Sequence, residues 1–128
     1  MKKKILLIVH PFKFTKYYNS RYELSYLKNE YNLDIKIHQL IDFLYPNFKS
    51  AFNQDIGDLE VSSYSSFKIW KKNFREIIKN NKSNIVILSE IPIRSIKELM
   101  IAIELKKANV PIIEFRSPSG PQKRDKNI

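Results

Sequence analysis

Four short apolar runs along the chain predict β-strands. Residues 4–10 (KILLIVH) and 84–89 (NIVILS) are apolar without alternation, which is typical of strands covered on both faces of a parallel sheet. Residues 33–40 (LDIKIHQL) alternate apolar with polar positions, which indicates a half-buried or edge strand. Residues 111–115 (PIIEF) predict a short last strand, since proline is tolerated at a first strand position, where no N–H is needed.

Apolar residues at helical spacing separate these strands. A Ser-x-x-Glu capping box at Ser20 predicts a helix from about Arg21 to Tyr31, and a second one at Ser95 begins a helix that ends near Asn109. Residues 67–78 place apolar side chains at i, i+3, i+7, i+10 and i+11, a helical face expected to lie in the core. The apolar positions of the three helices are Tyr22, Leu24, Leu27 and Tyr31, then Phe67, Trp70, Phe74, Ile77 and Ile78, then Ile96, Leu99, Met100 and Ile103.

Residues 41–63 show no sustained period and are expected to form a long loop. The order β-α-β, loop, α-β-α-β, with right-handed crossovers, predicts an α/β fold built on one doubly wound, mainly parallel sheet of four to five strands. A chain of 128 residues can bury one core without splitting. One Rossmann-like domain is therefore expected over residues 1–118, followed by a polar tail over residues 119–128.

Composition narrows the class of protein. Hydrophobic residues make up 43% of the chain and charged residues 28%, which is ordinary globular usage and excludes disordered and membrane-embedded classes. The longest apolar run, Ile5–Val9, is too short to cross a bilayer, and no small-residue cleavage site follows it, so no signal peptide is expected. The absence of cysteine excludes disulfides, thiolate zinc sites and cysteine nucleophiles, and a cytoplasmic location is expected.

The formal charge of +10 favours an anionic partner only if the cations gather on one face. The lysines are scattered, and Lys, Asn and Ile share A/T-rich codons, so composition accounts for much of the charge. A nucleic-acid binder would need Lys and Arg to converge, and no recognition motif supports that class. Contact with an anionic membrane surface stays open, with Lys13 and Lys16 and the neighbouring aromatic residues as candidates.

Polar residues follow the predicted strands at the edge where a doubly wound sheet binds its ligands. His10 ends the first strand, Glu90 follows the strand over residues 84–89, and Arg116 and Ser117 follow the last one, so all should line one crevice. His10 is the candidate catalytic base, and Glu90 could orient the imidazole and stabilise its charge. A hydrogen-bonded structural histidine is the alternative.

Phe12, Lys13 and Arg94 are further candidates for binding an acceptor. Aromatic faces next to cations bind sugars and bases, although packing at a helix start explains the same residues. Arg94 and Arg116 could clamp a carboxylate or phosphate, or they could be solvated surface residues. A metal site built on His38 lacks Asp or Glu at ligand spacing, so neither a metal nor another cofactor is expected.

Missing residues exclude several classes with related folds. The chain has two glycines, Gly57 and Gly120, and neither follows the first strand, which disfavours dinucleotide-binding and P-loop sites. Residues 11–17 lack the Thr, Ser and Gly run of a flavin phosphate loop. A phospho-receiver domain needs acidic residues at the end of its first strand, where this chain has His10.

The runs KILLIVHPFKF, KNEYNLDIKIHQL, NIVILSEIP and VPIIEFRSP together resemble the start of bacterial surface-polysaccharide glycosyltransferases of the two-domain GT-B type. The resemblance spans residues 2–118 and rests on the rhythm of strands and helices. It implies that the chain is the Rossmann-like N-terminal half of such an enzyme, the half that mainly binds the acceptor.

The resemblance also implies which partners the chain has and that it needs a second domain for activity. The acceptor would be a glycan or a lipid-linked sugar at the inner membrane face, and His10 or Glu90 would be its base. The nucleotide-sugar site belongs to the other half of such enzymes, so this chain is expected to be inactive without a separate donor-binding domain, as a truncated or split gene product. The alternative is a non-catalytic α/β binding module or partner subunit.

Overall fold

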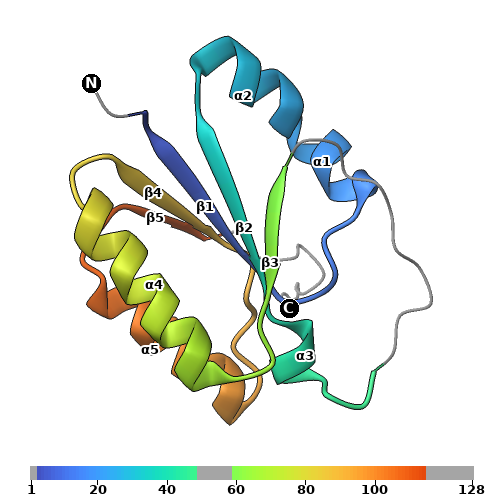
Figure 1. The fold of residues 1–128 in the computed structure, drawn as a ribbon. Helices are drawn as coiled ribbons and strands as arrows, with labels where there is room; N and C mark the ends of the chain where they lie inside the picture. The colour runs from blue at the N-terminus through green and yellow to red at the C-terminus, as the bar shows by residue number, and fades with distance from the viewer. Residues whose placement is uncertain (1–2, 49–58, 115–128) are drawn as a thin grey trace, which may run out of the picture.

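The computed structural model describes residues 3–48 and 59–114, which form a five-stranded sheet with helices on both faces (Figure 1). The strands are β1 (Ile5–His10), β2 (Asp34–Gln39), β3 (Glu60–Ser63), β4 (Ile85–Ser89) and β5 (Ile112–Glu114). The helices are α1 (Lys16–Tyr22), α2 (Leu24–Tyr31), α3 (Ile41–Leu44), α4 (Phe67–Asn81) and α5 (Ile96–Lys107).

The strand order is β3-β2-β1-β4-β5, and every neighbouring pair is parallel. The chain proceeds outward from β1 to β3, then crosses back to place β4 on the other side of β1. The order therefore reverses between β1 and β4, at the point where ligands bind in sheets of this kind. The predicted doubly wound, mainly parallel α/β fold is confirmed.

The helices cover the sheet from two sides, as Figure 1 shows, with α4 and α5 on one face and α1 and α2 on the other. Leu7 and Val9 of β1 pack with Trp70 of α4, whereas Ile8 packs with Leu24 of α2. Consecutive side chains of a strand point to opposite faces, and both faces are buried here, which explains why residues 4–10 show no polar alternation. No helix in the described ranges is long and apolar enough to cross a membrane.

The predicted single helix over residues 21–31 is wrong, because the helical segment begins at Lys16 and breaks at Glu23. Glu23 adopts the left-handed conformation, with φ 51° and ψ 43°, and its side chain caps neither helix, so the expected capping box is not formed. In a continuous helix, residues two apart point to nearly opposite sides. The break lets Tyr22 and Leu24 both face the sheet.

The prediction of a loop over residues 41–63 is wrong at both ends. A short helix, α3, begins just after β2, and β3 is an edge strand of the sheet that pairs with β2. Residues 49–58 lie outside the described part of the chain. Glu60 bonds to Lys36 across the β2–β3 pair at 3.1 Å. A strand of four partly exposed residues carries little apolar signal, so its pairing partner decides its conformation.

The other predicted helices are confirmed. Residues 67–81 form α4, which buries Trp70 and Phe74 as expected. The Ser95 side chain accepts a hydrogen bond from the Glu98 N–H at 3.3 Å, so the capping box that begins α5 is present. The last strand, β5, begins at Ile112, one residue later than predicted, and the predicted end at Phe115 lies outside the described residues.

Candidate functional site

His10 and Glu90 form a hydrogen-bonded pair at the switch point of the sheet. His10 is the last residue of β1 and Glu90 follows β4 directly, and 2.9 Å separate Nδ1 of His10 from Oε1 of Glu90. The prediction that these two residues share one edge is confirmed. A carboxylate only accepts hydrogen bonds, so Nδ1 carries the hydrogen, and Nε2 of a neutral ring is left as an acceptor.

Tyr22 is the third member of this group. Its hydroxyl donates to Oε2 of Glu90, so both carboxylate oxygens are held. Burial, followed by this hydrogen bond to Glu90, raises the pKa of Tyr22 well above its ordinary value, and the phenol keeps its proton. Sequence reasoning gave Tyr22 a packing role only, because no spacing signal links it to Glu90, 68 residues further along the chain.

Aromatic rings enclose the imidazole of His10, which is 1% exposed. Their centroids lie at 4.3 Å for Tyr18, 5.3 Å for Phe14 and 6.4 Å for Phe12, and all three rings meet His10 edge to face. Nε2 of His10 is buried without a hydrogen-bond partner in the part of the chain that the structure describes. A buried polar atom of this kind costs about 1–3 kcal/mol of stability, which makes Nε2 the atom that a ligand would satisfy.

The segment after β1 is fixed to the end of β2. The Phe14 N–H donates to Oε1 of Gln39 at 2.8 Å, and Gln39 in turn donates to the hydroxyl of Ser63 on β3. Lys13 lies on this segment, partly buried, between β1 and α1. The predicted binding residues Phe12 and Lys13 therefore stand on a loop that is tied to the carboxyl ends of β2 and β3.

Arg94 lies at the outer rim of the site, where Tyr45 contacts both Arg94 and Phe12. Phe12 stacks on Tyr45 with 5.6 Å between ring centroids, and Nη2 of Arg94 donates to the Tyr45 hydroxyl at 3.1 Å. Arg94 also pairs with Glu98 at 3.4 Å, which partly neutralises it as an anion clamp. A hollow of about 490 Å³ lies beside this cluster. The remaining predicted site residues, Arg116 and Ser117, lie outside the described residues.

His38 belongs to the opposite face of the sheet and cannot share a metal ion with His10. It stands beside Val9 in the β1–β2 register, and its Nδ1 accepts the indole N–H of Trp70 at 3.1 Å. Burial, and secondarily the charge of Lys36, lowers the pKa of His38 to about 4. Within residues 3–48 and 59–114, no group of three or more His, Cys, Asp or Glu side chains is arranged to hold a metal ion.

No family model, characterised protein or solved structure matches the chain. The side chains themselves are then the basis for a functional proposal. They consist of a buried imidazole oriented by a carboxylate, an aromatic enclosure, and a rim of aromatic and basic residues at the switch point of a parallel sheet.

Proposed function

We propose that the chain is the acceptor-side domain, or a fragment of it, of a bacterial glycosyltransferase in surface-polysaccharide biosynthesis. A glycan or lipid-linked acceptor binds at the carboxyl edge of the sheet, and a separate domain supplies the nucleotide sugar. The chain alone is inactive. It works at the inner membrane face, in peripheral contact with anionic lipid.

The observation that carries this proposal is the orientation of His10. Glu90 accepts a hydrogen bond from Nδ1 at 2.9 Å, and Nε2 has no hydrogen-bond partner among the described residues. A neutral imidazole held in this tautomer has a basic Nε2, and the carboxylate behind it stabilises the imidazolium that forms when Nε2 takes a proton. Tyr22 holds the far oxygen of Glu90, so the carboxylate cannot easily rotate away.

These groups suit one step of sugar transfer. The acceptor hydroxyl oxygen bonds to the anomeric carbon of the donor sugar, and Nε2 of His10 takes the hydroxyl proton. The bond between the anomeric carbon and the nucleoside diphosphate breaks, and the diphosphate leaves with the bonding electrons. Because His10 is 1% exposed and aromatic rings surround it, a neighbouring side chain has to move aside before a hydroxyl reaches Nε2.

The test uses the two histidines of the chain as internal reporters. The whole chain is labelled with ¹⁵N in its imidazole rings, and octyl glucoside, octyl galactoside and octyl N-acetylglucosaminide are added below their micelle-forming concentrations. At least one glycoside should shift the ring-nitrogen signals of His10. The signals of His38 should stay in place, because that ring contacts Trp70 on the other face of the sheet.

Matched variants complete the test. His10→Gln should abolish binding of the glycoside, whereas His38→Asn should bind it like the wild type. Either of two results overturns the proposal: none of the three glycosides shifts His10, or binding persists unchanged in His10→Gln.

A non-catalytic binding module is the second candidate function. The observation in its favour is the near-complete burial of His10, since a histidine at 1% exposure can serve as a hydrogen-bonded core residue. In that case His10→Gln lowers the free energy of unfolding, and the octyl glycosides leave both histidine signals unchanged.

A further inference from the structure

Helix α5 turns its apolar stripe away from the core. Ile96 is 73% exposed, and Leu99, Met100 and Ile103 continue the stripe at 42%, 38% and 47% exposure. The spacing i, i+3, i+4, i+7 normally marks the buried face of a helix. Monomeric soluble proteins rarely leave a contiguous apolar stripe of this kind in water, so this face is a candidate interaction surface.

The acidic residues of α5 point inward instead. Glu98 is 2% exposed, and its carboxylate accepts hydrogen bonds from the backbone N–H of Arg94 at 2.7 Å and from the hydroxyl of Ser95 at 3.3 Å. Glu104 is 5% exposed and binds the Arg75 guanidinium of α4 through two hydrogen bonds, of 2.6 and 3.1 Å. The outer face of α5 therefore carries no carboxylate of its own to oppose an anionic partner.

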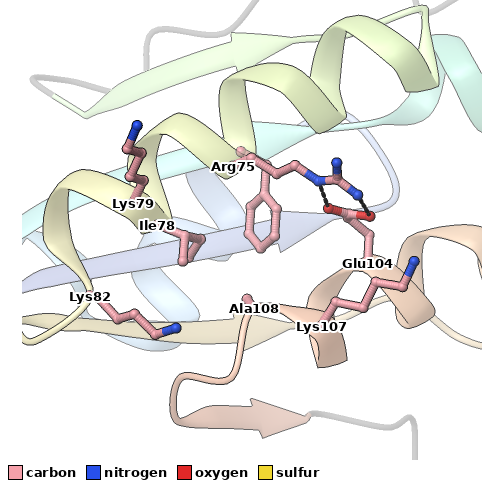
Figure 2. A pocket seen from close by; sticks show the side chains of 8 residues that line it. Arg75, Ile78, Lys79, Lys82, Glu104, Lys107 and Ala108 are labelled. Atoms are coloured by element: carbon pink, nitrogen blue, oxygen red, sulfur yellow. Dashed lines mark hydrogen bonds and ion pairs between the residues drawn. The ribbon is translucent and has the colours of Figure 1, made fainter.

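Lysines continue the stripe at its C-terminal end. Lys106 and Lys107 follow Ile103 by three and four residues, so they lie on the same helical face, and both are exposed. A hollow of about 460 Å³ adjoins them between α4 and α5. Figure 2 shows the side chains that line it, with Lys79 and Lys82 on the α4 side. Among the described residues, no acidic side chain pairs with these lysines, whereas Arg75 forms an ion pair with Glu104.

This charge distribution favours one kind of partner for the outer face of α5 over another. Two copies packed through α5 in parallel would bring their lysines together. Packed antiparallel, Lys106 and Lys107 of one copy would lie near Arg94 of the other, whose charge Glu98 offsets only in part, so like charges disfavour a second copy in both orientations. A surface that is apolar along one helix and basic at its end, with its carboxylates buried, is complementary to an anionic lipid bilayer.

We propose that α5 docks the chain on an anionic membrane surface. Ile96, Leu99, Met100 and Ile103 enter the interface, and Lys106 and Lys107 contact lipid phosphates. Ile96 also lines the hollow beside Tyr45 and Arg94, so the rim of the candidate site adjoins the bilayer. The docking surface stands on α5 alone. It specifies the lipid contact of the proposed function, and its use, to bring a lipid-linked acceptor to His10, rests on that function.

Vesicle co-sedimentation tests this surface with the whole chain. Wild-type protein should bind phosphatidylglycerol–phosphatidylcholine vesicles, bind pure phosphatidylcholine weakly, and dissociate as salt rises. Ile96→Ser combined with Ile103→Ser should weaken binding by about tenfold, since affinity scales with the apolar area inserted. Lys106→Gln combined with Lys107→Gln should weaken it by about 25-fold, since each basic residue near an anionic surface strengthens binding by about fivefold.

Two control variants change the same residue types elsewhere. Ile69→Ser removes an isoleucine that is 58% exposed on α4, and Lys68→Gln with Lys72→Gln removes two exposed lysines of α4. Both should bind vesicles like the wild type. Circular dichroism checks that each variant is folded, and His10→Gln should also bind normally, so this proposal and the transfer proposal fail separately.

Three results overturn the inference. The stripe variant binds vesicles like the wild type; or the α4 lysine control loses as much affinity as the α5 lysine variant; or light scattering shows a dimer that the stripe variant abolishes. The last result would identify α5 as a contact between two copies of the chain.

Discussion

The buried pair of His38 and Trp70 should make the protein lose stability when the pH falls below about 6.5. Nδ1 of His38 accepts the indole N–H of Trp70 at 3.1 Å, and burial lowers the pKa of His38 to about 4. A histidine in the unfolded chain has a pKa of about 6.5. The unfolded state thus binds a proton that the folded state rejects, and acid favours unfolding.

The size of the effect follows from the two pKa values. Between pH 7 and pH 5, linkage removes about 2 kcal/mol from the free energy of unfolding, and the full loss below pH 4 is about 3 kcal/mol. The stability that depends on a neutral His38 is therefore complete above pH 7 and gone near pH 4. Protonation also turns Nδ1 into a donor, which cannot accept the Trp70 N–H.

Urea unfolding of wild type and His38→Asn measures this effect. The Asn side-chain oxygen can accept the Trp70 N–H but does not titrate. Trp70 is the one tryptophan in the sequence, so its fluorescence follows unfolding at the pair itself. Between pH 7 and pH 5 the wild type should lose about 2 kcal/mol more than the variant. Parallel losses in the two proteins would refute the reasoning, since carboxylates that titrate elsewhere are common to both.

Three further predictions concern other parts of the chain. Glu23→Gly should raise the free energy of unfolding by about 1 kcal/mol in urea, because glycine adopts φ 51° without the side-chain clash that Glu23 has there; a destabilised variant would contradict this. Tyr22→Phe should lower the free energy of unfolding by about 1–3 kcal/mol, because one oxygen of Glu90 loses its hydrogen-bond donor; an unchanged urea midpoint would show that water replaces the hydroxyl. The purified chain should neither hydrolyse nor transfer sugar from UDP-, GDP- or CMP-sugars in a nucleotide-release assay, and clear turnover with any of them would show that donor binding needs no second domain.

The sequence by itself determined the strands that build the centre of the sheet and the edge that carries the site. Residues 4–10 and 84–89 are apolar on both strand faces, which only a sheet covered on both sides can satisfy. In a parallel sheet the strands end at one edge, so His10 and Glu90 could be placed together from their positions after these runs. The period of residues 67–78 likewise identified α4.

Only the tertiary structure decided what depends on contacts between distant elements. Tyr22 reaches Glu90 because the helix breaks at Glu23, and the same break lets Leu24 pack in the core. The stripe of α5 faces outward because Ile101 and Leu105 pack into the core on the opposite face of the helix. On that inner face, Arg75 of α4 and the helix start satisfy the buried carboxylates Glu104 and Glu98. Local spacing specifies which residues share a helical face, but which face is buried depends on the free energy of pairing across elements, and that quantity has no local signal in the sequence.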